Sequence, residues 1–347
     1  MTKLFGTDGI RGRAFEPPLD ENTVRRLGAA LAEELAADCA NPAILLAGDT
    51  RASTPELAEW LASAYQAAGG KVTWGDVLPT PAVSYLVRQG AFHAGVVISA
   101  SHNPAHDNGI KVLGAGGEKI DDEREQRLEL RIASAAGDGA INLPAHDTSL
   151  RDRYLDFLAA SHDNQKSLAG LRVVVDAANG AASGIARQLL ERLGATVETI
   201  ASQPNGQNIN AGCGATAPEL LAERVTASGA DAGLALDGDA DRGILVDEKG
   251  RIFDGDDILL AWARQLHDRS LLPGGTVVAT VMSNFGLERT LHGEGMKMVR
   301  CPVGDRAVWL TMKEHGSALG GEQSGHIICS HHGVSGDGLM TGTHVLA

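Results

Sequence analysis

The pattern that most constrains the fold of this 347-residue chain is a unit that occurs three times. Each copy has an apolar strand, a polar turn, a helix with apolar residues at helical spacing, a glycine turn and a second strand. The first strands with the polar turns that follow them read AILLAGD at 43–49, RVVVDAANG at 172–180 and TVVATVMSN at 276–284. Three copies predict three α/β domains of about 100 residues each, with right-handed crossovers and mixed, largely parallel sheets.

Residue identity among the copies is low, and β-α-β units recur in any α/β protein, so a coincidental likeness stays open at this point. In the first copy we expect Ser53 and Thr54 to cap the helix that carries Leu57, Leu61 and Tyr65. Turn-forming residues interrupt the periodic segments at 134–148 and 247–257. We therefore place the domains at 1–150, 151–253 and 254–347, packed around a central cleft.

The composition narrows the class of protein. A chain of this length exceeds one ordinary core, which agrees with several domains. The net charge of -14 repels nucleic-acid phosphates and anionic membranes, so we expect neither as a partner. The four cysteines are far apart and form no C-x-x-C pair, and no signal peptide or run of about 18 apolar residues occurs. These features predict a cytoplasmic protein.

Aspartates alternate directly after an apolar strand in ADAGLALDGDADRG. Gly238 and Ala240 leave room for the backbone to curl, so Asp237, Asp239 and Asp241 can converge. Carboxylates about 4 Å apart repel by roughly 4 kcal/mol per pair at an effective dielectric near 20, so the cluster calls for a cation. Oxygen ligands favour Mg²⁺, which often completes its coordination with a phosphate oxygen.

Two other interpretations of the aspartates remain. One is an acidic surface turn. The other is a phosphatase with an aspartyl nucleophile, because a strand followed by D-x-D resembles the haloacid-dehalogenase phosphatases. Those enzymes usually place Thr or Val at the position of Asp241.

A second polar loop interrupts AGVVISASHNPAHDNGIKVLG between Ser99 and Pro104 and exposes Ser101 at a strand end. Ser101 and His102 are adjacent, and neighbours on a strand point to opposite faces, so they form no hydrolase triad. Ser101 is more plausible as a carrier of a phosphoryl group. Lys111 could neutralise a phosphate or exchange a proton, or be an ordinary solvated lysine. We assign no catalytic step to His102 or His106.

Four motifs together resemble the α-D-phosphohexomutase superfamily, and among its members most closely the bacterial phosphoglucosamine mutases. They are FGTDGIRG at 5–12, SASHNP at 99–104, DGDADR at 237–242 and GEQSGH at 321–326. They follow the superfamily's order and spread over nearly the whole chain. GEQSGH alone could be an ordinary polar turn.

The resemblance implies a role for each matching residue. Ser101 would be the phosphoserine, and its phosphate with Asp237, Asp239 and Asp241 would hold one Mg²⁺ per chain. Lys111 would be the general acid/base, and Arg11 and Arg242 would accompany the phosphoserine. Glu322 and Ser324 would bind sugar hydroxyls, and His326 would assist proton exchange near the sugar.

The implied reaction interconverts glucosamine 6-phosphate and glucosamine 1-phosphate. It would proceed through phosphoserine and glucosamine 1,6-bisphosphate, which serves as intermediate and activator, and would feed UDP-N-acetylglucosamine and peptidoglycan precursor synthesis. Phosphomannomutase or phosphoglucomutase activity, an aspartate-dependent phosphatase and a non-catalytic sugar-phosphate binder are the alternatives. A homodimer is also considered.

The sequence departs from the superfamily in one respect. Relatives have a fourth, C-terminal domain with an R-x-S-G-T-E-like loop that grips the non-transferring phosphate, and this sequence contains no such loop. It ends in DGLMTGTHVLA, which reads as the start of a helix. We therefore expect a truncated chain that binds metal and carries phosphoserine but turns over poorly.

Overall fold

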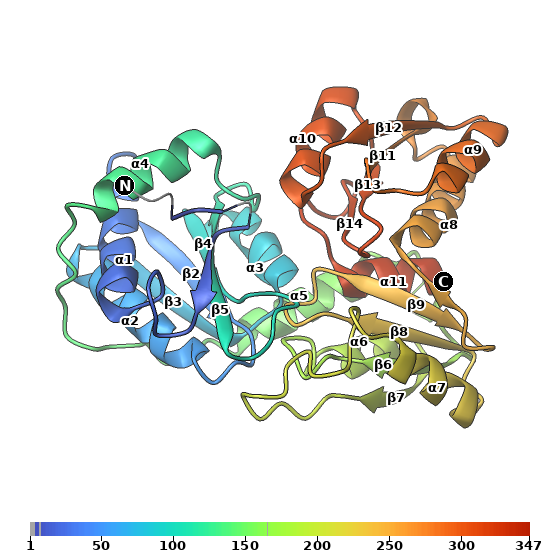
Figure 1. The fold of residues 1–347 in the computed structure, drawn as a ribbon, viewed down its shortest axis with the longest axis horizontal. Coiled ribbons are helices and arrows are strands. Elements are labelled where there is room, and N and C mark those ends of the chain that lie inside the picture. The colour runs from blue at the N-terminus through green and yellow to red at the C-terminus, as the bar shows by residue number, and fades with distance from the viewer. Residues whose placement is uncertain (1–3, 7, 165) are drawn as a thin grey trace. The chain divides into compact units, whose positions relative to one another are not determined.

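The computed structural model describes residues 4–6, 8–164 and 166–347 (Figure 1). The chain divides into two compact units. Unit 1 comprises Met1–Tyr154 and Pro204–Ile209, and unit 2 comprises Leu155–Gln203 and Asn210–Ala347. Among the described residues, no helix has both the length and the apolar character that a membrane span requires.

Each sheet contains the same arrangement of four strands. The sheet of unit 1 has β2 (Ala43–Gly48), β3 (Lys71–Val77), β4 (Ala94–Ile98) and β5 (Asp107–Gly114). The first sheet of unit 2 has β6 (Arg172–Asp176), β7 (Thr196–Ile200), β8 (Ala232–Leu236) and β9 (Gly243–Asp247). Its second sheet has β11 (Thr276–Thr280), β12 (Lys297–Cys301), β13 (Leu319–Gly321) and β14 (Ile327–Cys329).

The pairing of these strands confirms the predicted repeat. In every sheet the first strand of the repeat lies between the second and third, parallel to both, and the fourth strand pairs antiparallel with the third. Two short antiparallel strands, β1 (Ile10–Arg13) and β10 (Ile252–Phe253), extend the first and second sheets. One topology in three sheets supports a structural repeat over coincidence, and confirms three α/β domains with mixed sheets. The boundaries near residues 150 and 253 stay predictions.

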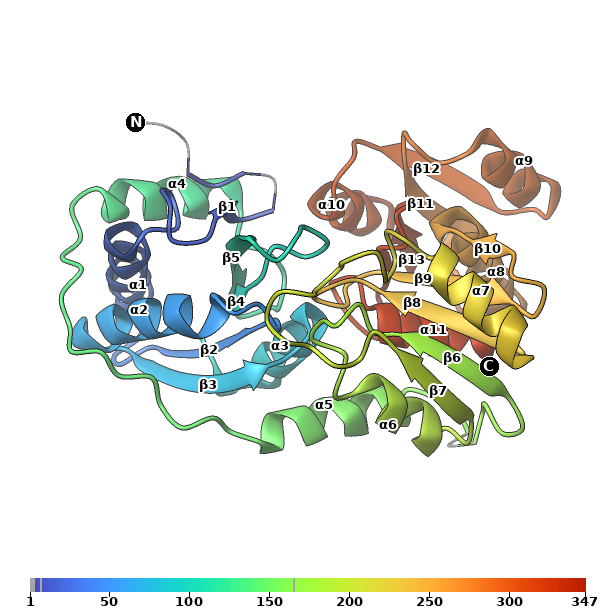
Figure 2. The same ribbon diagram turned by 60° about the horizontal axis from the view of Figure 1, so that its bottom comes forward.

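Helices cover the sheet of unit 1. They are α1 (Glu21–Ala36), α2 (Thr54–Ala67), α3 (Thr80–Leu86) and α4 (Asp122–Ile132). Helix α1 packs against α2 and α4, and α2 packs on β2 and β3 (Figures 1 and 2). Gly28 permits the close approach of α1 to α2, because a Cβ there would lie 2.3 Å from the carbonyl oxygen of Leu61.

The predicted start of α2 is right, but the predicted side-chain cap is wrong for Ser53. Ser53 is the N-cap residue, yet its side chain makes no capping hydrogen bond. Its hydroxyl instead accepts a hydrogen bond from the Asn108 amide at 2.8 Å. The hydroxyl of Thr54 donates to Asp49 at 3.3 Å. Both side chains therefore tie the helix to neighbouring strand ends rather than to its own backbone.

Unit 2 uses two helices to join its sheets. The helices that follow α5 (Ser149–Ala160) are α6 (Ala186–Arg192), α7 (Glu219–Ser228), α8 (Gly255–Asp268), α9 (Phe285–Gly293), α10 (Asp305–His315) and α11 (Gly338–Leu346). Helix α11 packs on β8 and β9, and α8 contacts α11, β9 and β13. The first and second sheets of unit 2 thus share a packed interior, with Leu259, Trp262 and Leu339 almost fully buried.

Candidate active site

The polar motifs occupy the same topological position in each domain. Residues 99–106 connect β4 to β5, residues 237–242 connect β8 to β9, and residues 322–326 connect β13 to β14. Each loop therefore joins the third and fourth strands of its repeat, where a parallel strand ends and the chain reverses direction. We call them the serine loop, the aspartate loop and the glutamate loop.

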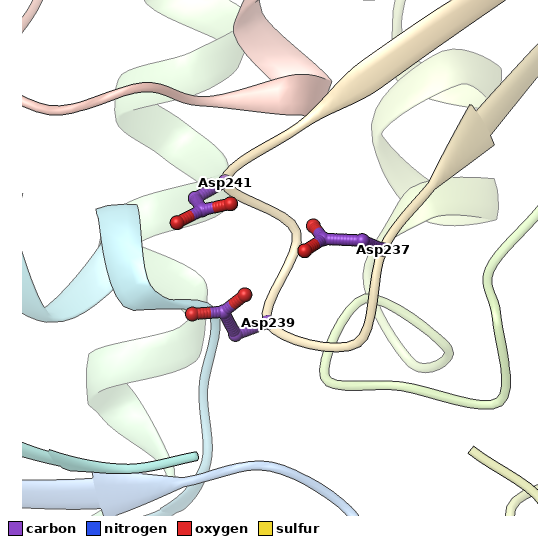
Figure 3. A group of neighbouring side chains, drawn as sticks. All are labelled: Asp237, Asp239 and Asp241. Carbon is purple, nitrogen blue, oxygen red and sulfur yellow. The ribbon is translucent and has the colours of Figure 1, made fainter. Parts of the chain in front are cut away.

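The aspartate loop brings three carboxylates together, as predicted (Figure 3). One oxygen from each of Asp237, Asp239 and Asp241 lies within 4.8 Å of the others, and all three residues are buried. Ala240 adopts φ 56°, a left-handed conformation that turns the chain between the last two aspartates. Buried carboxylates at this spacing repel unless a cation joins them, and an all-oxygen ligand set fits Mg²⁺.

The backbone behind the aspartate loop is tightly packed. A Cβ on Gly180 would lie 2.4 Å from the carbonyl oxygen of Gly238, and the N–H of Ala181 donates to that same oxygen at 2.8 Å. The N–H of Arg242 donates to Asp237 at 3.2 Å. These contacts fix the directions in which the carboxylates point.

Two basic side chains adjoin the aspartates. Burial alone would lower the pKa of Arg242, but Asp237, Asp241 and Asp239 raise it above its ordinary value. His326 is 3% exposed, and its Nδ1 lies 3.6 Å from Asp241 Oδ2. Burial also lowers the pKa of His326, yet the carboxylates of Asp241, Asp305 and Glu322 together outweigh it and raise that pKa. The carboxylates of the aspartate loop thus favour the protonated forms of Arg242 and His326.

The serine loop holds Ser101 in an unusual backbone conformation. The expectation that the loop exposes Ser101 is wrong, because Ser101 is 2% exposed. It has φ 51°, in the left-handed region that few non-glycine residues adopt. Its N–H donates to the hydroxyl of Ser99 at 2.9 Å. Its own Oγ lies 3.3 Å from Nδ1 of His102. The expectation that Ser101 and His102 point to opposite faces is therefore wrong, because Ser101 lies in a turn and not on a strand.

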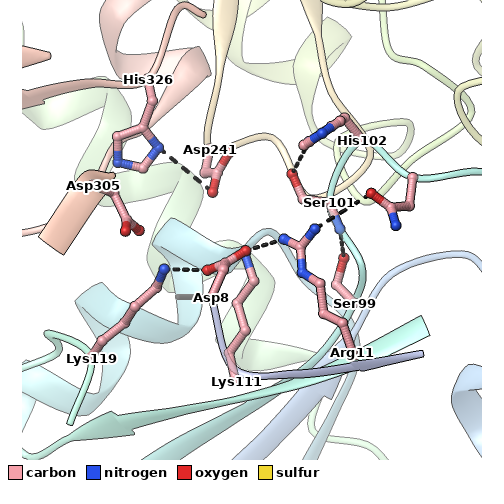
Figure 4. Close-up of polar contacts among 12 residues, drawn as sticks. Asp8, Arg11, Ser99, Ser101, His102, Lys111, Lys119, Asp241, Asp305 and His326 are labelled. Atoms are coloured by element: carbon pink, nitrogen blue, oxygen red, sulfur yellow. Dashed lines mark hydrogen bonds and ion pairs between the residues drawn. The ribbon is translucent and has the colours of Figure 1, made fainter. Parts of the chain in front are cut away.

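Three cations in unit 1 converge on one carboxylate (Figure 4). Lys111, on β5 and 1% exposed, lies 3.3 Å from Asp8 Oδ2, and Lys119 and Arg11 also form ion pairs with Asp8. Burial would raise the pKa of Asp8, but Lys111, Lys119 and Arg11 hold it well below its usual range. Arg11 also donates to Asn103 of the serine loop at 3.4 Å. Arg11 therefore links the ionic cluster to the loop that carries Ser101.

The glutamate loop borders a pocket of about 550 Å³ within unit 2. Glu322, Ser324 and Arg242 line it together with the apolar side chains of Met282 and Val303. Glu322 accepts a hydrogen bond from the N–H of Gly304 at 3.0 Å. The buried hydroxyl oxygen of Ser324 has no hydrogen-bond partner among the described residues. The pocket thus combines a carboxylate, a hydroxyl and a cation, which suits a polyhydroxylated anion.

The predicted residues fall into two groups. Unit 1 contains Ser101, Lys111 and Arg11. Unit 2 contains the remainder, namely Asp237, Asp239, Asp241, Arg242, Glu322, Ser324 and His326. Thr7 of the FGTDGIRG motif lies outside the described residues.

Sequence reasoning missed several charged residues. Asp8 joins Lys111 because β1 pairs with β5, about one hundred positions away. Lys119 follows β5 and forms an antiparallel bridge with Leu113 of that strand. Asp49 and Arg51 lie buried next to the serine loop, although the turn after a strand usually reads as solvent-exposed. Asp49 ends the apolar run at 43–49, and a charged residue at that position was the signal that could have indicated the Asp49–Arg51 pair.

Comparison with known proteins identifies the family. Residues 2–137, 152–250 and 254–347 match α/β/α domains I, II and III of phosphoglucomutase/phosphomannomutase, respectively. The chain belongs to the phosphoglucomutase/phosphomannomutase family. It is 46% identical over 343 residues to a phosphoglucosamine mutase of Solibacter usitatus, covering 97% of this chain and 76% of that protein.

Two further members of the family agree. A phosphoglucosamine mutase of Chelativorans sp. is 45% identical over 350 residues, which cover 99% of this chain and 78% of that protein. The crystal structure of a phosphoglucomutase/phosphomannomutase family protein from Burkholderia thailandensis is similar with a TM-score of 0.85 and 29% identity. That match covers 99% of this chain and 76% of the other.

Proposed function

We propose that the chain is a phosphoglucosamine mutase that interconverts glucosamine 6-phosphate and glucosamine 1-phosphate. The observation that carries the proposal is the placement of Ser101, the three aspartates and Glu322 on equivalent loops of three repeated domains. The likeness of 45–46% to two phosphoglucosamine mutases supports glucosamine as the sugar.

In the first half of the reaction toward glucosamine 1-phosphate, the C1 hydroxyl of glucosamine 6-phosphate would lose its proton to His326 and attack the phosphorus of phosphorylated Ser101. The bond from phosphorus to Ser101 Oγ breaks, and glucosamine 1,6-bisphosphate forms. Lys111 would donate a proton to the departing Oγ and accept one in the reverse direction. Once the bisphosphate has turned around, Ser101 would lose its proton to Lys111 and attack the phosphate at C6, while His326 returns a proton to the departing C6 oxygen and glucosamine 1-phosphate is released.

The other residues bind and orient. Asp237, Asp239 and Asp241 would hold one Mg²⁺ together with a phosphate oxygen of phosphorylated Ser101. The ion would neutralise charge on the transferring phosphoryl group. Arg11 and Arg242 would bind phosphate oxygens as fixed cations, and Glu322 and Ser324 would accept from and donate to sugar hydroxyls. His326 would exchange a proton near the sugar.

Intact-protein mass measurement tests the covalent step. We expect a gain of about 80 Da on the wild type after incubation with glucosamine 1,6-bisphosphate, and none on Ser101→Ala. Continuous release of inorganic phosphate would favour an aspartate-dependent phosphatase instead. Rates with glucosamine, glucose and mannose phosphates then decide the sugar, and a preference for mannose or glucose would move the proposal to phosphomannomutase or phosphoglucomutase.

We further propose a cytoplasmic enzyme whose partners are small sugar phosphates and not nucleic acids or membranes. The net charge of -14 supports this choice of partners. Homodimer formation stays a prediction, which sedimentation analysis of the purified chain would test.

A further inference from the structure

A buried ion pair adjoins the serine loop. Asp49 and Arg51, in the turn that follows β2, are each 1% exposed and form a side-chain ion pair. The N–H of Arg51 also donates to Asp49 Oδ1 at 3.0 Å. Burying two charges carries a desolvation cost that their attraction often fails to exceed. Stability alone is therefore a weak reason for this pair.

The pair is connected to both peptide groups of Ser101. On the amino side, the hydroxyl of Ser99 donates to Asp49 and accepts from the N–H of Ser101. On the carboxyl side, Nη2 of Arg51 donates to the carbonyl oxygens of Ser101 at 3.1 Å and Asn103 at 2.6 Å. One ion pair thus holds the backbone before and after the residue that we propose as the nucleophile.

The left-handed conformation of Ser101 explains why such a connection would be needed. A serine at φ 51° is strained and persists only when surrounding contacts determine it. If the turn relaxed to an ordinary conformation, the direction of Cβ and therefore the position of Oγ would change. Phosphoryl transfer requires an in-line arrangement of attacking and leaving oxygens, so a small displacement of Oγ is costly in rate.

The second domain shows that the fold itself does not demand this ion pair. Asp176 ends β6, the strand that is equivalent to β2, and it is also fully buried. Its carboxylate accepts from the backbone N–H groups of Ala178 at 2.9 Å and Gly214 at 2.8 Å. In the second domain, backbone N–H groups satisfy the buried carboxylate, whereas beside the serine loop the guanidinium of Arg51 pairs with the carboxylate of Asp49.

We propose that Asp49, Arg51 and Ser99 are positioning residues that fix the backbone of Ser101 for phosphoryl transfer. The inference rests on the proposed function of Ser101. It requires that weakening the connection slow the transfer of phosphate to and from Ser101, while leaving the affinity for the sugar phosphate and for the metal unchanged.

Two variants test the connection. Ser99→Ala removes the hydroxyl between Asp49 and the N–H of Ser101 with little change in volume. Arg51→Lys keeps the charge beside Asp49 but loses the planar fork that reaches two carbonyl oxygens. We expect the rate of Ser101 phosphorylation by glucosamine 1,6-bisphosphate, and kcat, to fall about tenfold for Ser99→Ala and on the order of 100-fold for Arg51→Lys. KM should change less than about twofold.

Ser63→Ala is the matched control. Ser63 is 2% exposed, donates to the carbonyl oxygen of Glu59 at 2.6 Å and accepts from the N–H of Asn142 at 2.9 Å. The variant Ser63→Ala therefore removes a buried hydroxyl and its two hydrogen bonds, neither of which involves the serine loop. We expect its phosphorylation rate to equal that of the wild type, even if its midpoint of thermal unfolding falls.

The outcomes separate this inference from the proposed function. Wild-type rates of phosphorylation in both variants would overturn the positioning role, as would a rise in KM without a fall in kcat. If Arg51→Lys fails to fold by circular dichroism, Ser99→Ala decides alone. If the folded wild type never acquires phosphate on Ser101, the proposed function fails first, and the positioning role fails with it.

Discussion

The serine loop and the aspartate loop occupy the same connection of the repeat and differ in charge. Both join a third strand to an antiparallel fourth strand, and both contain a non-glycine residue at positive φ, Ser101 at 51° and Ala240 at 56°. The serine loop is linked through Arg11 to a cluster that contains two lysines. The aspartate loop presents three buried carboxylates.

This difference shows how one topology supports opposite tasks. The end of a buried parallel strand places a short loop at a fixed edge of the sheet, whatever its side chains are. Cations near Ser101 suit an anionic group such as a phosphate, whereas the carboxylates of the aspartate loop suit a metal cation. The side chains grafted on the loop, rather than the topology, therefore decide its chemistry.

Neutralising the aspartate loop should have the largest effect. We expect the double variant Asp237→Asn, Asp239→Asn to lose Mg²⁺ binding by calorimetry and at least about 10³-fold in mutase rate, since metal charge is worth several kcal/mol to phosphoryl transfer. Asp247→Asn is the control, because Asp247 ends β9 on the same sheet and its carboxylate pairs with the exposed Arg251 of the following turn. Unchanged Mg²⁺ affinity in the double variant would show that the aspartate loop is not the metal site.

The basic side of the comparison depends on Lys111. Lys111→Met should lower kcat about 100-fold, because general acid–base catalysis contributes at least that much and methionine keeps the buried apolar stem. Lys119→Met is the matched variant. It removes another lysine that pairs with Asp8, and we expect a loss of less than about tenfold. Equal losses in steady-state assays would show that the cluster acts only through its total charge.

The glutamate loop extends the comparison to the third domain. Glu322→Gln should raise KM for the sugar phosphate about tenfold, since hydrogen bonds to a charged partner contribute roughly 1.5–3 kcal/mol. The glutamine can still accept from the N–H of Gly304, so the loop should keep its shape. Glu294→Gln, which alters an exposed pair with Arg264, serves as control. A fall in kcat at constant KM would place Glu322 in the chemical step.

The repeat and the aspartate cluster could be predicted because both are local patterns. Runs such as AILLAGD are apolar enough to indicate buried strands, and alternating aspartates after a strand must share a turn. The first strands of the three repeats, at 43–48, 172–176 and 276–280, begin at the predicted positions and end inside the predicted strand-and-turn segments.

Contacts between distant segments could not be predicted. The ionic cluster around Asp8 depends on the pairing of β1 with β5, and the burial of Asp49 and Arg51 depends on the packing of the serine loop over them. The direction of Ser101 was misjudged because its positive φ is imposed by tertiary contacts that no local pattern records. Charged residues next to a strand end are equally compatible with solvent.

The two units should also differ in their response to acid. In unit 2, the imidazole ring of His344 on α11 stacks on His162 with 4.2 Å between ring centroids and lies 4.5 Å from His332. Burial, reinforced by the charges of neighbouring histidines, lowers the pKa of His344 to about 3 and that of His332 to about 4. Burial also lowers the pKa of His162. The cluster therefore stays neutral when folded.

The last expected effect follows from this cluster and concerns stability rather than catalysis. Unfolded histidine has a pKa near 6.5, so below that pH the unfolded chain binds more protons at His162, His332 and His344 than the folded one, and their contribution to the stability of unit 2 falls with the pH. The raised pKa of His326 acts in the opposite direction. For His344 alone the loss between pH 7 and pH 5 is about 2 kcal/mol. In unit 1, Asp8 and Glu34 have lowered pKa values, so their contribution is lost only below about pH 4.

Hydrogen exchange, corrected for the intrinsic effect of pH, would measure the two units separately. We expect amides of β8 and α11 to lose protection between pH 7 and pH 5, while those of β2 and β4 keep theirs. His344→Phe retains an aromatic ring for stacking but cannot titrate, so it should reduce the pH dependence of unit 2 even if it lowers stability at pH 7. Equal loss of protection in both units would show that acid acts on them through a common cause and not through the histidines.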